Sequence, residues 1–311
     1  GAISDWQPLR REIDFSLEHG SGAAGSSCGL SCGGPSGWAV PGPSGARALR
    51  LGCAEDETMI TNMERVSDGG PEAAADVAPR KICVVTGGSS GIGAAVCAEF
   101  AANGYEVVCV ARRPCPLASA KSVLADLSSV DTAQASAEEV AQFLGEQAQV
   151  CLVHCASSYP SDAAQTPDVV WLHLALQLNV VAPSVLTARL LRHMAAGSSV
   201  IFVGSTLSEK AVVGKFSYCT AKHAMVGLMR ATAQDLLRSG MHTMLVCPGI
   251  TDTPMVREAI RGQESAFEGF VSDLQGRMVT SQEVASIIAD VARQPILNGT
   301  ILHCNNGQRE R

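Results

Sequence analysis

The chain has 311 residues, 46% of them hydrophobic, and a formal net charge of −7. This acidic balance gives no basic field for a nucleic-acid partner, and no apolar run approaches the ~20 residues of a membrane span. Twelve cysteines are present, but most fall in predicted strands and helices, where reduced thiols pack as small apolar groups. We therefore expect a reducing compartment and no metal site, because Cys28/Cys32 and Cys151/Cys155 lack a second matched pair.

The first part of the chain, residues 1–80, is rich in glycine, serine, alanine and proline and has no sustained apolar period. Such a stretch cannot bury enough surface to offset its ordering entropy, so we predict a disordered extension before a single domain at 81–311. Because Met59 and Met63 precede the fold, the upstream part could be a fragment, a targeting extension or leader sequence. Four acidic residues within the first eighteen count against a transit peptide. We expect a cytoplasmic protein, or an organellar one if residues 1–62 are a targeting extension.

The folded part opens with a strand, a glycine turn and a helix. Residues 81–85 are an apolar run typical of a buried parallel strand, and residues 94–100 are predicted to be helical. This order places backbone N–H groups and a helix N-terminus against a pyrophosphate. A tight turn without a ligand is the alternative. The residues expected to bind the cofactor here are Thr86, Gly87, Ser89, Ser90, Gly91, Ile92 and Gly93.

A second strand, residues 106–111, ends where an NAD-binding protein places a carboxylate for the ribose 2′-hydroxyl. Ala111 stands at that position here, and Arg112 and Arg113 follow it. No carboxylate repels a 2′-phosphate, and a guanidinium can hold one through two parallel hydrogen bonds. The sequence therefore predicts NADP(H) as cofactor, unless the two arginines only form a solvated basic turn.

The remaining pattern alternates helices and strands, which predicts a Rossmann-type doubly wound parallel sheet between two helical layers. Residues 254–278, with three glycines, are predicted to form a mobile helical lid over a substrate. The expected helices are 131–149, 168–196, 216–239 and 281–293, and the expected strands are 150–153, 199–204, 241–247 and 299–304.

Tyr218 and Lys222 are four residues apart on one predicted helix, so they share a face. Proton transfer to a carbonyl oxygen needs a donor, and a tyrosine with its reference pKa of about 10 is a poor one. A nearby ammonium and the positive charge of an oxidised nicotinamide both favour the phenolate and lower that pKa. The pair therefore predicts an acid–base centre.

Together these residues resemble the short-chain dehydrogenase/reductase family, from about Lys81 to Gly307, in its shorter single-domain branch. The glycine spacing and the Tyr-x-x-x-Lys pair carry the resemblance. It implies that Ser205 positions the substrate oxygen, that Tyr218 is the general acid or base, and that Lys222 and Asn179 complete a catalytic tetrad and contact the cofactor. It also implies cofactor contacts at Asp126, Leu127, Ala156, Pro248, Gly249, Ile250 and Thr253.

One segment departs from the family pattern. His154-Cys155-Ala156-Ser157 stands where the family carries Asn-Asn-Ala-Gly, and only Ala156 is retained. His154 is interpreted as a core histidine with a satisfied ring nitrogen instead of a catalytic group.

These features predict an NADP(H)-dependent oxidoreductase that transfers hydride between the nicotinamide and a carbonyl or secondary alcohol. The first substrate hypothesis is a 3-oxoacyl thioester or a small ketone. The resemblance further implies a homodimer or homotetramer. The alternative is a non-catalytic NADP(H)-binding redox sensor or scaffold of the same fold.

Overall fold

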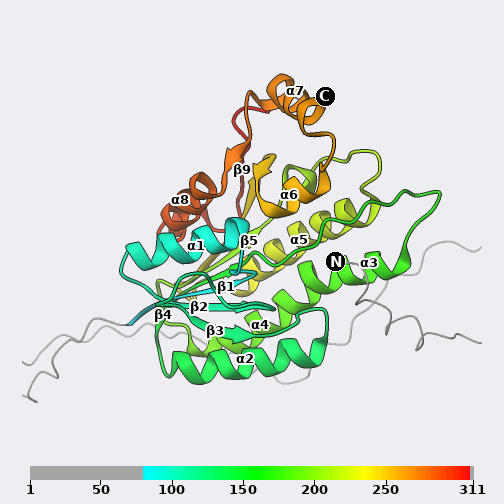
Figure 1. Cartoon of the computed structure of the whole chain (residues 1–311). Coiled ribbons are helices and arrows are strands. Elements are labelled where there is room, and N and C mark those ends of the chain that lie inside the picture. Colours follow the sequence, from blue (N-terminus) through cyan, green and yellow to red (C-terminus); the bar gives the residue numbers. More distant parts are fainter. Residues whose placement is uncertain (1–79, 309–311) are drawn as a thin grey trace, which may run out of the picture. The chain divides into compact units, whose positions relative to one another are not determined.

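A computed structural model describes residues 80–308, and the predicted extension at 1–80 lies outside them except for its last residue. Its main sheet has seven parallel strands in the order β3-β2-β1-β4-β5-β6-β9, as expected for a doubly wound fold (Figure 1). The strands are β1 (Lys81–Thr86), β2 (Glu106–Ala111), β3 (Lys121–Leu124), β4 (Gln149–His154), β5 (Ser199–Val203), β6 (His242–Pro248) and β9 (Ile301–Cys304).

Helices cover both faces of the sheet, with α1 beside α8 on one face and α2 beside α4 on the other (Figure 1). The α-helices are α1 (Gly91–Ala102), α2 (Val130–Leu144), α3 (Val169–Leu176), α4 (Ala182–Leu190), α5 (Phe216–Asp235), α6 (Pro254–Ala259), α7 (Glu264–Gln275) and α8 (Ser281–Val291).

The strands are apolar on both faces because each face has its own core. In β1, Ile82 and Val84 join the core beneath α2, α4 and α5, whereas Cys83 and Val85 join the core beneath α1 and α8. Successive side chains of a strand point to opposite faces, so an uninterrupted apolar run fits a strand buried on both sides. This confirms the interpretation of residues 81–85.

The strand order reverses between β1 and β4, which pair in parallel with Thr86 opposite His154. In such sheets a crevice opens at the carboxyl ends of the strands where the order reverses, because the connections leave in opposite directions. The glycine turn after β1 and the altered segment after β4 therefore lie on either side of this point.

The long helix expected at 168–196 is interrupted. It starts at α3, capped by the carboxylate of Asp168, passes through a π-helical turn (Gln177–Val181) and continues as α4 and a 3-10 turn (Leu191–His193). A π-turn inserts one extra residue per turn, which hydrophobic periodicity does not reveal.

Among the described residues, the helical segment Val169–His193 is long and apolar enough to cross a membrane by length and composition, with a mean hydropathy of 1.7. The expectation that no segment approaches a membrane span was therefore wrong in length and composition for this one segment. A helix packed in a globular layer passes the same test, and here α4 packs on α2 and α3 packs on α5.

The end of another predicted helix was wrong. The helix expected at 131–149 ends at Leu144, where Gly145 has a φ of 68°, and β4 begins at Gln149. The region predicted as a helical lid, residues 254–278, does contain helices α6 and α7, and a short parallel pair, β7 (Thr251–Asp252) with β8 (Val279–Thr280), joins its two ends. Two-residue strands are too short to produce an alternating pattern.

Candidate functional site

Every residue expected to bind the cofactor or act in catalysis, apart from two on α5 and one in the π-turn, lies at the carboxyl end of a strand of the main sheet or in the segment directly after it. Parallel strands bring these ends to one edge, so residues far apart in sequence share one crevice. The segments are the glycine turn after β1, Arg112 and Arg113 after β2, Asp126 and Leu127 after β3, Ala156 after β4, Ser205 after β5, and Pro248 to Thr253 at the end of β6.

The glycine turn needs its glycines for space and for backbone conformation. Gly87 and Gly91 have φ angles of 72° and 54°, a region that L side chains rarely adopt. A Cβ on Gly93 would collide with the carbonyl oxygen of Gly87, because α1 starts directly beside the turn. Ser90 is the N-cap of α1 and Ser89 precedes it, so the turn ends at the N-terminus of this helix. The cradle fits a pyrophosphate.

Thr86 ties this turn to the altered segment after β4. Its hydroxyl oxygen accepts hydrogen bonds from the backbone N–H groups of Cys155 and Ala156, at 3.1 and 3.2 Å. A Cβ on Gly87 would lie 2.8 Å from the Cα of Ala156. The two segments are therefore in direct contact, although only Ala156 keeps the family's residue type.

Arg112 and Arg113 directly follow β2, which pairs with β1, and both are exposed. Asp126 follows β3, and its carboxylate accepts a hydrogen bond from the N–H of Ser128 at 3.0 Å, while Leu127 is buried in the core. The guanidinium groups are thus free to meet a ligand from solvent, whereas Leu127 anchors its loop.

Ser205, Tyr218 and Lys222 lie together where β5 meets α5. The Ser205 hydroxyl is close enough to the Tyr218 phenol to lower its pKa, and the Lys222 Nζ lies 5.6 Å from the centroid of the Tyr218 ring. The Lys222 ammonium donates to the carbonyl oxygen of Val203, the last residue of β5, at 2.9 Å. The predicted trio is brought together by one strand end and one helix turn.

Burial sets the protonation of this trio. It raises the pKa of Tyr218, and the Ser205 hydroxyl opposes that rise only in part. It also lowers the pKa of Lys222 to about 8. Within the chain itself desolvation dominates, the expected lowering of the Tyr218 pKa is not seen, and Tyr218 holds its proton at neutral pH.

Asn179 lies in the π-turn and is fully buried. Its amide nitrogen donates to the carbonyl oxygen of Ala175 at 2.8 Å, and its amide oxygen accepts from the Ser157 hydroxyl at 3.0 Å. Ser157 stands where the family has glycine, so this hydrogen bond comes from the departure itself. It joins the altered segment to the helix that carries Asn179.

His154 fits its interpretation as a core histidine. Its Nε2 is 2.9 Å from the Thr187 hydroxyl, its ring stacks on Phe202, and burial lowers its pKa to about 3. Within residues 80–308, its Nδ1 has no hydrogen-bond partner. The ring is therefore neutral at physiological pH and packs in the core at the end of β4.

Tyr159 is a site residue that the sequence analysis missed. Its ring meets that of Tyr218 edge to face, with centroids 4.9 Å apart, and the Lys215 Nζ lies 3.4 Å above the Tyr159 ring. The same Nζ donates to Ser161 at 2.7 Å. A lone tyrosine in a loop gives no sequence signal, because its role depends on the neighbour that the fold brings to it.

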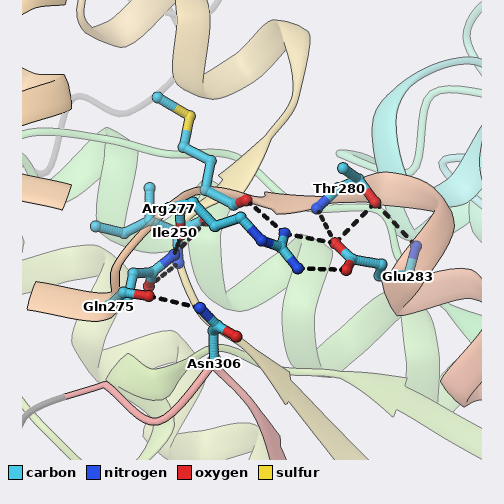
Figure 2. A network of polar contacts seen from close by, with 7 residues as sticks. Ile250, Gln275, Arg277, Thr280, Glu283 and Asn306 are labelled. Atoms are coloured by element: carbon cyan, nitrogen blue, oxygen red, sulfur yellow. Dashed lines mark hydrogen bonds and ion pairs between the residues drawn. The ribbon is translucent and has the colours of Figure 1, made fainter. Parts of the chain in front are cut away.

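Gln275, at the end of α7, was also missed. Its side-chain amide hydrogen-bonds with the backbone N–H and carbonyl oxygen of Ile250, in the turn after β6 (Figure 2). Its backbone carbonyl oxygen accepts from the side-chain amide of Asn306 at 2.7 Å. Figure 2 also shows Arg277 paired with Glu283, whose carboxylate accepts from the N–H of Thr280. The turn expected to contact the nicotinamide is thus fastened to both the lid and the C-terminal segment.

Comparisons with known proteins agree with this geometry. A family model described as short chain dehydrogenase matches residues 81–264. Short-chain dehydrogenase fogB of Aspergillus ruber is 26% identical over 246 residues, covering 67% of this chain and 88% of that protein. Human 3-oxoacyl-(acyl-carrier-protein) reductase is 28% identical over 244 residues, covering 73% and 97%.

Solved structures give the same result for the fold. Thermoplasma acidophilum aldohexose dehydrogenase superposes with a TM-score of 0.69 at 23% identity, covering 75% of this chain and 96% of that one. A blue fluorescent protein from a metagenomic library, in complex with NADPH, has a TM-score of 0.65 at 25% identity, covering 73% and 97%.

Proposed function

Because this chain belongs to the short chain dehydrogenase family of oxidoreductases, we propose that it catalyses NADP(H)-dependent hydride transfer between the nicotinamide and a carbonyl or secondary alcohol. The observation that carries the proposal is the contact of Ser205, Tyr218 and Lys222 at the end of β5. The nicotinamide supplies or accepts the hydride when bound, and the chain's own residues supply the proton and the positioning.

In the reducing direction, Tyr218 is the proton donor. Its raised pKa keeps the phenol protonated at neutral pH, and the Ser205 hydroxyl beside it would help to hold a substrate oxygen near the phenol. Lys222, held by the Val203 carbonyl, places a positive charge beside the phenolate that forms when the proton leaves. Asn179 would relay protons to Lys222, a role that rests on the family resemblance.

We also propose NADP(H) as the preferred cofactor. Arg112 and Arg113 follow Ala111 at the end of β2, without a carboxylate at that position, and a guanidinium suits a 2′-phosphate. The 25% identical structure in complex with NADPH supports this choice. The pyrophosphate would lie on the glycine turn, with Thr86, Ala156 and the turn from Pro248 to Thr253 closing the crevice around it.

A 3-oxoacyl thioester or small ketone is the proposed substrate class. It is supported by relatives named 3-oxoacyl-(acyl-carrier-protein) reductase in human, rat and mouse, which are 27–28% identical. Tyr159, whose ring meets that of Tyr218 edge to face, would form one wall beside the substrate carbonyl.

The direct test is NADPH oxidation, followed by absorbance, against a panel of 3-oxoacyl thioesters and ketones. Tyr218→Phe should abolish turnover while NADPH still binds. Tyr105→Phe is the matched control, because Tyr105 packs on Phe100 away from the site and its change should leave turnover intact. Turnover that persists in Tyr218→Phe would refute the assignment of the proton donor.

A second candidate function is a non-catalytic NADP(H)-binding redox sensor or scaffold. The observation that favours it is the altered segment, in which the Ser157 hydroxyl donates a hydrogen bond to the side-chain oxygen of Asn179. Tight NADPH binding without turnover on the whole panel would support this function and refute the enzymatic one.

Three further properties belong to the proposal. We propose an independent domain at 81–311, a cytoplasmic location, and a homodimer or homotetramer. All nine cysteines within the described residues are free thiols, in agreement with a reducing compartment. Val169, Val170 and Trp171 expose apolar side chains on α3, which a second copy could cover. Light scattering of the purified chain would give the mass of the assembly.

A further inference from the structure

Three thiols meet beneath the glycine turn although no sequence motif relates them. Cys97 lies on α1, Cys109 on β2 and Cys115 in the loop that follows Arg112 and Arg113, and their sulfur atoms all lie within 4.8 Å of one another. No metal site is expected from the short-range cysteine pairs Cys28/Cys32 and Cys151/Cys155. Here the fold brings single cysteines of three segments to one point.

The cluster is built against Gly88 of the turn. A Cβ on Gly88 would lie 2.7 Å from the sulfur of Cys109 and 2.8 Å from that of Cys97. The Cys97 and Cys115 thiols both donate to the Gly88 carbonyl oxygen, at 3.9 and 3.6 Å. The sulfur atoms therefore fill the space behind the turn and face a common centre.

One member of the cluster is reachable from solvent. Cys97 and Cys109 are buried, but Cys115 is only partly so. Its backbone N–H donates to the Ser122 hydroxyl at 3.0 Å, which fastens its loop to β3. The third sulfur is thus held in position while its side of the cluster remains open, as a binding site requires.

We propose that Cys97, Cys109 and Cys115 form a three-thiolate site for a thiophilic closed-shell cation, for which Zn²⁺ is the probe. Zinc binds thiolates at ~2.3 Å in tetrahedral geometry, which sets the sulfur atoms about 3.8 Å apart. The three sulfur atoms lie within 4.8 Å of one another, so shifts of about 1 Å or less would bring them to that spacing. The fourth position faces the open side at Cys115, where water would bind.

Loading changes the charge behind the turn. The three thiols release their protons to solvent, so one dication and three thiolates leave a single net negative charge where the thiols were neutral. This negative charge lies beside Gly88 and would repel the pyrophosphate of a cofactor bound on the glycine turn. This consequence rests on the proposed function: loading weakens NADPH binding, and by linkage NADPH weakens metal binding by the same factor.

The first experiment measures the metal alone, on full-length protein kept reduced and free of nucleotide. Zn²⁺ is titrated in competition with a chromophoric chelator, and Co²⁺ is added separately to detect thiolate-to-metal charge-transfer absorption. Wild type should take up one more equivalent than Cys115→Ser and should show a Co²⁺ band that this variant lacks. Cys304→Ser, which changes a partly buried thiol outside the cluster, should behave as wild type.

Cys115→Ser is chosen because the residue lies in a loop and its hydroxyl can still donate to Gly88, so the fold is retained. Cys109→Ser, with folding checked by circular dichroism, is the second variant. Equal uptake by wild type and both variants would overturn the proposal. A wild type that shows thiol loss under mild oxidation and no metal uptake would overturn it too, in favour of a disulfide.

The second experiment measures NADPH affinity by fluorescence with and without Zn²⁺. The dissociation constant should rise severalfold with Zn²⁺ in wild type and stay unchanged in Cys115→Ser. Metal uptake with no effect on NADPH refutes the coupling and leaves the metal site. NADPH that does not bind under any condition refutes the proposed function instead, because the metal titration does not depend on it.

Discussion

The side-chain amide of Gln275 hydrogen-bonds with both backbone polar groups of Ile250. Its Oε1 accepts from the N–H at 3.0 Å, and its Nε2 donates to the carbonyl oxygen at 2.8 Å. The same Nε2 donates to the carbonyl oxygen of Arg277 at 2.8 Å, and the Gln275 side chain is buried. The carbonyl oxygen of Ile250 also accepts from the N–H of Val279 in β8, at 2.9 Å, so the Gln275 side chain supplies the partner of the Ile250 N–H and a second donor to its carbonyl.

Gln275→Leu should destabilise the protein by about 1–3 kcal/mol, because the partly buried N–H of Ile250 loses its partner while the carbonyl oxygen keeps only the Val279 N–H. The measurement is urea denaturation, with NADPH affinity followed in parallel, and we expect affinity to fall as well because the nicotinamide turn loosens.

Gln282→Leu is the matched control for this change, since the exposed Gln282 amide only donates to the Glu99 carboxylate. It should shift stability by less than about 0.5 kcal/mol. Equal effects of the two substitutions would show that the Ile250 contact contributes nothing specific.

The part of the site that the sequence predicts is the part built from local pattern. The turn from Thr86 to Gly93 could be recognised because its strand, glycines and helix are adjacent in the chain, and Tyr218 and Lys222 because four residues make one helical turn. Gln275 gave no such signal, since its partner Ile250 is 25 residues away. The same is true of Tyr159 and Tyr218, which only the packing of a loop on α5 brings together.

Boundary errors have a similar origin. Apolar periodicity extends through the π-turn that contains Asn179, so one helix was predicted where the structure has several helical segments. The cysteines that were predicted to be ordinary core residues are indeed buried or partly buried. Cys97, Cys109 and Cys115 meet because of the order of strands and helices in the fold, and their spacing in the sequence does not reveal it.

Two glycine substitutions should change stability in opposite directions. Gly93→Ala places a Cβ against the Gly87 carbonyl oxygen, and because backbone cannot move aside without deforming the turn, we expect a loss of about 1–3 kcal/mol and of NADPH binding. Gly227→Ala, within α5, meets nothing within 4 Å and should stabilise by about 0.5–1 kcal/mol. Thermal unfolding of both variants tests this. A stabilised Gly93→Ala would mean that the turn has room the structure does not show.

Arg112→Asp should reverse or erase a preference for NADPH over NADH. Charge-assisted hydrogen bonds to a phosphate contribute roughly 1.5–3 kcal/mol, so NADPH affinity should fall at least about tenfold while NADH affinity holds or rises. Dissociation constants for both nucleotides, measured by fluorescence, give the answer.

Arg238→Asp makes the same charge change at an exposed residue in the turn after α5, remote from β2. It should leave the ratio of the two affinities unaltered. If Arg112→Asp, Arg113→Asp and Arg238→Asp all give the wild-type ratio, the arginines form only a solvated basic turn and the assignment of NADP(H) fails.

The buried ammonium of Lys222 should make stability depend on pH in a defined direction. Burial lowers its pKa from 10.5 to about 8, so between those values the unfolded chain binds more protons than the folded one. Stability therefore rises with pH across this range, and below about pH 8 the full cost of the buried charge remains. Lys222→Met removes the charge, so its stability relative to wild type should fall by about 1 kcal/mol on going from pH 7 to pH 9.

This difference is measured by urea denaturation of both proteins at the two pH values, which cancels the titration of every other group that the substitution leaves unchanged. Lys81→Met, at the exposed start of β1, controls for the loss of one positive charge. The loss of the hydrogen bond to the Val203 carbonyl shifts Lys222→Met equally at both pH values, so only the change between them reports the lysine's ionisation. A stability difference that does not change with pH would mean that Lys222 keeps its ordinary pKa, and then an ammonium beside Tyr218 is present throughout the physiological range.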